Sequence, residues 1–204
     1  MNRREASKLE TRQLILNAAK KLFLEKGVEL CTMRGIAKKA GVSPASVVVH
    51  FKNKTALLET ALLEDVERNI ELAITSLPPE RDLYVRIMHI WKAMFFFYDK
   101  NRDLYRALIS RTAYLPDKES PNIARQMEEF LQFVGAMIRQ EQALGNVSPD
   151  IDVRIAAYNF AALYFGALMG FFRDPAMAPQ TAVDTLGEMV KQCLNGIMTN
   201  LEEK

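Results

Sequence analysis

The chain has 204 residues, of which 49% are apolar and 25% charged. This composition indicates a globular protein with a sizeable core and excludes collagen-like, low-complexity and wholly disordered chains. With 2 Cys and 2 His, the sequence offers neither a disulfide framework nor a Cys- or His-based metal centre, and we expect no metal and no cofactor. No apolar run follows the polar N-terminus, so we expect no signal peptide and a cytoplasmic protein.

The formal net charge of +2 conceals an uneven distribution. Residues 1–60 hold 12 Lys and Arg against 5 Asp and Glu, a net charge of +7. Residues 61–204 hold 15 Lys and Arg against 20 Asp and Glu, a net charge of −5. A basic head on an acidic body points to a polyanion partner for the head, although a solvated charged surface gives the same pattern.

The predicted fold is all-α, because no stretch alternates apolar and polar residues with the period of a strand. In the first helix, from about Ser7 to Lys26, apolar residues recur at helical spacing, and Gly27 is placed to end it. Thr32 and Asn53 are predicted caps of later helices. The remaining helices are predicted over about 33–40, 44–50, 54–75, 80–98, 103–113, 121–143, 149–172 and 179–200, which makes nine.

Three Ser-Pro pairs are predicted to open helices, with serine as the cap and proline as the first helical residue. These pairs are Ser43-Pro44, Ser120-Pro121 and Ser148-Pro149.

The two short helices at 33–40 and 44–50 are joined by Ala40-Gly41-Val42-Ser43, which is a helix-turn-helix arrangement. Gly41 permits a positive φ in the turn, and Val47 and Phe51 can anchor the second helix inward. The outer side of that helix is then free to enter a major groove with Pro44, Ala45, Ser46, Val48, Val49 and His50. Candidate phosphate contacts flank it at Arg34, Lys38, Lys39, Lys52 and Lys54.

These residues resemble the DNA-binding head of the tetracycline-repressor (TetR) family. The resemblance covers about 55 residues and rests on the stretch from Thr32 to Ser43, on Val47, on His50-Phe51-Lys52-Asn53-Lys54, and on Leu57-Leu58. The preceding helix, with Ile15-Leu16-Asn17-Ala18-Ala19 and Leu22-Phe23-Leu24-Glu25-Lys26-Gly27, fits the same pattern.

The resemblance implies an all-helical, homodimeric transcription regulator, usually a repressor, whose heads bind a palindromic operator. It implies a DNA-binding domain at 1–54 and an effector-binding and dimerisation domain at 55–204. Carried onto this chain, Thr32, Arg34 and Lys54 become phosphate or flanking contacts, and Ser43 caps the recognition helix.

Two positions depart from the family pattern. The family usually has an aromatic residue, most often Tyr, where this chain has Val48, and it often has Gly where this chain has Ala45. Three consecutive β-branched residues, Val47-Val48-Val49, also form helices poorly. Apolar contact with thymine methyl groups therefore becomes the more plausible form of base readout.

The helix ending near Phe172 has the length of a membrane span, but its Tyr158, Asn159 and Tyr164 favour a buried helix, and we expect no membrane partner. Small residues recur on it, which allows close approach of another helix. Together with the last helix it is predicted to form the interface of a homodimer, unless both helices pack only within one chain. The predicted interface residues are Ala162, Gly166, Gly170, Leu186, Met189, Cys193 and Ile197.

Bulky apolar residues on the body helices suggest a pocket for an organic effector, with an ordinary core as the alternative. The predicted lining is Trp91, Phe95, Tyr98, Met127, Phe130, Phe160 and Tyr164, with His89 and Asn159 as polar groups that fix the ligand. Few charges fall on the inner faces, so a neutral or amphipathic ligand is favoured.

The sequence therefore predicts a ligand-responsive DNA-binding regulator, and the family resemblance implies that it acts as a repressor. The alternative is a DNA-binding adaptor whose body binds a protein and takes no small molecule. Because no nucleophile elbow, P-loop or dinucleotide fingerprint is present, we do not expect an enzyme, and we assign no catalytic residue.

Overall fold

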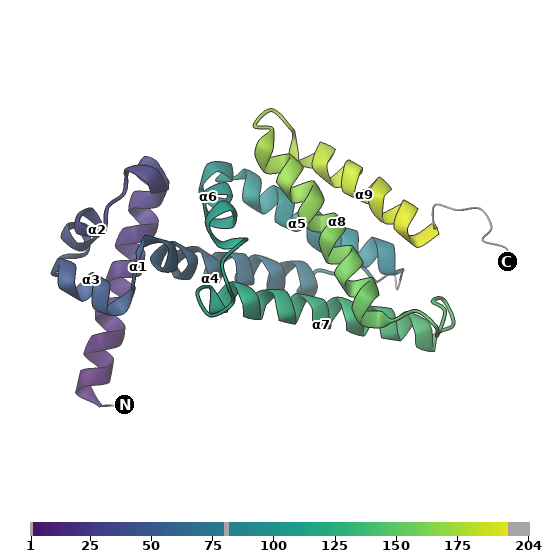
Figure 1. The fold of residues 1–204 in the computed structure, drawn as a ribbon, viewed down its shortest axis with the longest axis horizontal. Coiled ribbons are helices and arrows are strands. Elements are labelled where there is room, and N and C mark those ends of the chain that lie inside the picture. Colours follow the sequence, from purple (N-terminus) through teal and green to yellow (C-terminus); the bar gives the residue numbers. More distant parts are fainter. Residues whose placement is uncertain (1, 80–81, 196–204) are drawn as a thin grey trace. The chain divides into compact units, whose positions relative to one another are not determined.

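The computed structural model describes residues 2–79 and 82–195. These residues form nine α-helices and no strand, which confirms the all-α prediction (Figure 1). The helices are α1 Arg3–Leu30, α2 Met33–Ala40, α3 Pro44–His50, α4 Lys54–Thr75, α5 Leu83–Asp99, α6 Arg102–Thr112, α7 Pro121–Ala143, α8 Val153–Arg173 and α9 Pro179–Asn195.

The chain divides into two compact units. The first comprises residues 1–68 and 101–126, and the second comprises residues 69–100 and 127–204. The division assigns the helix-turn-helix to the first unit and α5, α8 and α9 to the second.

The core of the first unit forms around α1, whose inner face carries the predicted helical repeat. Ile15, Ala19 and Phe23 are buried there, α2 packs against α1, and α3 packs against α2. Gly27 has a φ of +75° and interrupts the helical geometry of α1, as the sequence predicts. The helix begins earlier than predicted because Asn2 and Glu5 form a capping box at its N-terminus.

The second unit places α9 against α5 and α8 (Figure 1). Its largest fully buried side chains include Trp91, Phe95 and Phe171. Within the described residues, α8 is the one helix long and apolar enough to cross a membrane. It also packs on α9 and carries seven buried residues, as a core helix of a bundle does.

One predicted helix start is wrong. Ser148-Pro149 does not open α8, because the Asp152 carboxylate caps the helix instead by accepting hydrogen bonds from the N–H groups of Arg154 and Ile155. Ser148 forms a turn, in which its carbonyl accepts the N–H of Ile151 at 3.2 Å.

Apart from those of α1, the other described helix ends lie close to their predicted positions. Asp82 caps α5, which therefore starts at Leu83 rather than at residue 80. The predicted end of the last helix at residue 200 lies outside the described residues.

Candidate nucleic-acid interface and ligand cavity

Local hydrogen bonds stabilise the N-termini of α2 and α3 and the turn between them. The Thr32 hydroxyl accepts the N–H of Gly35 at 3.0 Å and caps α2. Gly41 ends α2 with a φ of +71°, and the N–H of Val42 reaches the carbonyl of Ala37 at 3.1 Å. The Ser43 hydroxyl accepts the N–H of Ser46 at 3.1 Å and caps α3. These contacts confirm Thr32 and Ser43 as caps and Gly41 as the glycine of the turn.

Helix α3 has one anchored side and one open side. Val47 and Phe51 are buried, and the guanidinium of Arg12 lies 4.5 Å from the centre of the Phe51 ring. On the open side, Val48 is 54% exposed and Val49 is 78% exposed. Of the other predicted groove-facing residues, Pro44 and Ala45 are exposed, and Ser46 and His50 are half-buried.

The predicted phosphate contacts fall into two groups. Arg34, Lys38, Lys39 and Lys52 are exposed, and none has an ion pair within the described part of the chain. Thr32 is also exposed, although its hydroxyl serves as the cap of α2. This group is available to a polyanion.

Lys54 differs, because its ammonium already has partners inside the protein. Its Nζ donates to the carbonyls of Val28 at 2.9 Å and Cys31 at 3.2 Å. The start of α4 is thereby tied to the end of α1, and one N–H of the ammonium is left for another acceptor. Sequence reasoning missed this role, since residues 26 and 23 positions apart carry no local signal.

His50 lies in a cationic environment. Partial burial, together with the positive charges of Lys8 and Arg12, lowers the pKa of His50 below its ordinary value. The imidazole is therefore neutral at pH 7 and presents both a donor and an acceptor.

In the second unit, the predicted aromatic residues come together as a packed cluster. Trp91 stacks on Tyr164 with ring centres 5.5 Å apart, and Phe95 meets Tyr164 edge-on at 5.8 Å. Phe130 and Phe160 also contact Trp91. The cluster thus provides much of the core of this unit.

Tyr98 and Tyr164 place a polar pair inside this apolar environment, because their hydroxyl groups share a hydrogen bond. Burial raises the pKa of Tyr98 to about 12 and raises the pKa of Tyr164 well above its ordinary value. Both phenols are therefore protonated over the physiological pH range.

The remaining predicted ligand residues lie apart from this pair. Met127 is half-buried on α7, and Nε2 of His89 is 3.0 Å from the hydroxyl of Ser76. Asn159 is exposed on α8.

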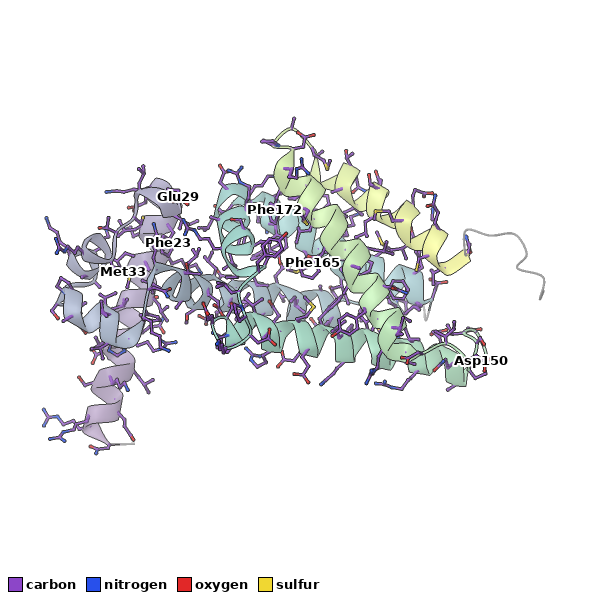
Figure 2. The ribbon with its side chains drawn as sticks, viewed as in Figure 1. Phe23, Glu29, Met33, Asp150, Phe165 and Phe172 are labelled. Atoms are coloured by element: carbon purple, nitrogen blue, oxygen red, sulfur yellow. The ribbon has the colours of Figure 1, made fainter. Side chains whose placement is uncertain are left out.

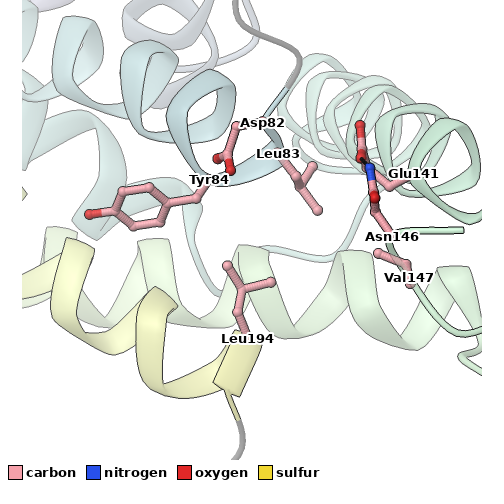
Figure 3. A pocket seen from close by; sticks show the side chains of 7 residues that line it. All are labelled: Asp82, Leu83, Tyr84, Glu141, Asn146, Val147 and Leu194. Carbon is pink, nitrogen blue, oxygen red and sulfur yellow. Dashed lines mark hydrogen bonds between the residues drawn. The ribbon is translucent and has the colours of Figure 1, made fainter. Parts of the chain in front are cut away.

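Two adjoining cavities, of about 450 and 460 Å³, lie in the second unit. They share Leu83, Asn146, Val147 and Leu194, and we call them together the terminal cavity (Figure 3). Of the nine predicted ligand residues, Phe160 and Asn159 line the terminal cavity. The other lining side chains include Asp82, Tyr84, Ile138, Glu141, Asp150, Ile151 and Asp152.

Most residues that line the terminal cavity were not predicted from the sequence. Asn146, Asp150 and Asp152 belong to the connection between α7 and α8, which has no helical periodicity to mark an inward face (Figure 2 labels Asp150). Within the described residues, no group of three or more His, Cys, Asp or Glu has the arrangement of a metal site.

The predicted dimer interface is distributed over several environments. Ala162 and Gly166 are exposed on α8, and Gly170 is half-buried. On α9, Met189 is half-buried near Gly166, while Cys193 is exposed and lines the terminal cavity.

Leu186 and Ile197 also belong to the predicted interface. Leu186 is fully buried within its own protomer, at 0% exposure, so its place is the internal core and not an outer face. Ile197 lies outside the described residues.

Comparison with known proteins identifies the class. A family model described as bacterial regulatory proteins of the tetR family matches residues 15–61. The HTH-type transcriptional regulator UidR of Escherichia coli (strain K12) is 29% identical over 162 residues, covering 78% of this chain and 80% of UidR. The nucleoid occlusion factor SlmA of Mannheimia succiniciproducens is 31% identical over 153 residues, covering 73% of this chain and 70% of SlmA.

A comparison with solved structures shows that the chain has the fold of this family. The structure of Thermus thermophilus FadR, a TetR-family transcriptional repressor in complex with lauroyl-CoA, has a TM-score of 0.71. The match covers 95% of this chain and 98% of FadR, at 18% identity.

Fold and helix-turn-helix together define a DNA-binding transcriptional regulator, and not an enzyme. The chain belongs to the tetR family of bacterial regulatory proteins.

Proposed function

We propose that the chain is a cytoplasmic repressor that binds a palindromic operator as a homodimer. The observation that carries the proposal is the open side of α3, where Val48 and Val49 are exposed while Val47 and Phe51 anchor the helix. Exposed apolar side chains on a capped helix are suited to contact thymine methyl groups in a major groove. Arg34, Lys38, Lys39 and Lys52 supply the flanking positive charge.

Residues 1–54 act as the DNA-binding domain in this proposal, and residues 55–204 bind the effector and the second copy. A small apolar or amphipathic effector in the body releases the operator. Support comes from the terminal cavity of this chain. FadR, which shares the fold and holds lauroyl-CoA, supports a bound effector in the body but not the charge of that effector. The effector acts only to the extent that it binds the DNA-free conformation more tightly than the DNA-bound one.

DNA selection from a random-sequence pool, followed by sedimentation of the selected duplex with protein, tests the proposal. We expect an inverted repeat to be enriched and two chains, or a multiple of two, to bind each duplex. Enrichment of an asymmetric site bound by one chain, or of no sequence, would contradict it. Replacing Arg34 by Ala should weaken binding to all sequences alike.

A second candidate is a DNA-binding adaptor whose body binds a protein. It is favoured by the relative SlmA, which is named as a nucleoid occlusion factor. A thermal-shift screen with apolar and amphipathic compounds separates the two functions. The repressor predicts stabilising compounds that also release the selected DNA, whereas the adaptor predicts none.

A further inference from the structure

We propose that the terminal cavity binds an organic cation with an apolar body, such as an alkyl or aryl ammonium ion. The inference rests on the proposed effector function and specifies the charge of the ligand. It draws on three features of the cavity: an apolar floor, a carboxylate that is almost wholly buried, and the absence of cations from the described lining.

The floor is apolar and preformed. Leu83, Ile138 and Phe160 line it and are buried, while Leu194 faces the space from α9 (Figure 3). Each adjoining part has the size of a pocket for a small organic molecule. An alkyl chain or an aromatic ring would lose contact with water in this space.

Glu141 supplies the buried charge. Its side chain is 5% exposed, and its Oε2 accepts a hydrogen bond from Nδ2 of Asn146 at 2.8 Å (Figure 3). Its other carboxylate oxygen has no hydrogen-bond donor among the described residues. A cationic head group that reaches this oxygen would form a charge-assisted hydrogen bond with it.

Three further carboxylates line the cavity, those of Asp82, Asp150 and Asp152. Asp82 and Asp152 cap helices, so part of their charge already interacts with backbone N–H groups. The carboxylate of Asp150 accepts no hydrogen bond in the described structure. The described lining holds four carboxylates and no Lys or Arg, which favours a cationic head group over an anionic one.

Calorimetric titration of the full-length protein, without DNA, tests this charge preference. The probes are decylammonium, decyl sulfate and decyl maltoside, each below its micelle concentration, because they share one alkyl chain and differ in the charge of the head. We expect the cation to bind about tenfold or more tightly than the sulfate. Equal or tighter binding of decyl sulfate or decyl maltoside would overturn the proposal.

Substitution of Glu141 tests whether its carboxylate binds the cationic head group. Glu141→Gln keeps the acceptor for Asn146 and removes the charge, so we expect about a tenfold loss of affinity for decylammonium. Glu128→Gln is the matched control, because Glu128 is exposed on the same helix and does not line the cavity, and its affinity should stay unchanged. An unchanged affinity in Glu141→Gln would overturn the assignment.

Asp150→Asn provides an independent readout if the Glu141 variant does not fold, since Asp150 is exposed. We expect about a threefold loss of affinity, and an unchanged affinity would contradict the proposal. Adding each probe to the protein on its selected DNA separates the two claims. Binding of the cation without DNA release would refute the effector mechanism alone, whereas release by decyl sulfate without cation binding would refute the cation site alone.

Discussion

Gly41 holds the turn between α2 and α3 in a left-handed conformation, with a φ of +71°. A Cβ at this position would meet no atom within 4 Å, so the need for glycine arises from the backbone alone. We expect Gly41→Ala to lower the free energy of unfolding by about 1–2 kcal/mol, measured by urea denaturation. Gly41→Asn should lose less, because Asn adopts this conformation more readily, and equal losses would contradict the argument.

Two nearby lysines are expected to have different roles. We expect Lys54 to stabilise the fold and Lys52 to bind a DNA phosphate. Lys54 donates to two backbone carbonyls, whereas Lys52 is exposed and has no ion pair in the described structure. We expect Lys54→Met to lower the free energy of unfolding by about 2 kcal/mol. Lys52→Met should leave stability nearly unchanged and reduce the slope of log affinity against log salt concentration by about 1. Denaturation and DNA titration of both variants distinguish the two roles, and a reversed pattern would refute them.

His50 should make both stability and DNA binding depend on pH. Folding lowers its pKa below 6.5, so the folded head binds fewer protons than the unfolded chain and loses stability as the pH falls through 6.5. If His50 enters the groove, nearby DNA phosphates favour its charged form and would raise its pKa in the complex. Affinity at constant salt should therefore increase as the pH falls below neutrality, and His50→Gln should remove that increase. A wild-type affinity that is constant or falls over this range would count against groove contact by His50.

At the scale of elements, the outer face of α8 is the proposed contact with a second copy. Ala162 is exposed there, as is Ala136 on α7, which provides a matched control in the same unit. We expect Ala162→Glu to weaken the dimer by tenfold or more in sedimentation equilibrium, because a buried carboxylate at a close helix contact has no partner. Ala136→Glu should leave association unchanged, and equal behaviour of the two variants would place the interface elsewhere.

Elements defined by local contacts could be predicted from the sequence. Thr32, Gly41 and Ser43 act within four residues of themselves, and the bounds of α2 and α3 match the prediction as a result. The predicted start of α8 is wrong because two candidate caps lie within a few residues of each other. Asp152 caps the helix, and Ser148 does not. The capping box of Asn2 and Glu5 is also a local pattern, and it starts α1 before the predicted start at Ser7.

In the candidate sites, too, contacts that follow from helical spacing could be predicted, and contacts that depend on tertiary packing could not. Helical spacing placed the aromatic residues around Trp91 on inward faces, and they do meet. Spacing could not show that Lys54 reaches back to α1, or that Glu141 and Asn146 line a cavity, because these contacts depend on packing and on an irregular connection. Nor could it show that Leu186 points into the protomer.

At the scale of the whole molecule, operator-specific regulation requires that α3 read bases while the surrounding cations bind phosphates. The most direct measurement is the affinity of wild type and Val49→Ala for the selected operator and for a scrambled duplex, at several salt concentrations. We predict that Val49→Ala lowers the ratio of operator to scrambled affinity by about 5- to 100-fold, with an unchanged salt slope, because it removes apolar contact with bases. An unchanged ratio, or an equal loss on both duplexes, would contradict base readout by the open side of α3.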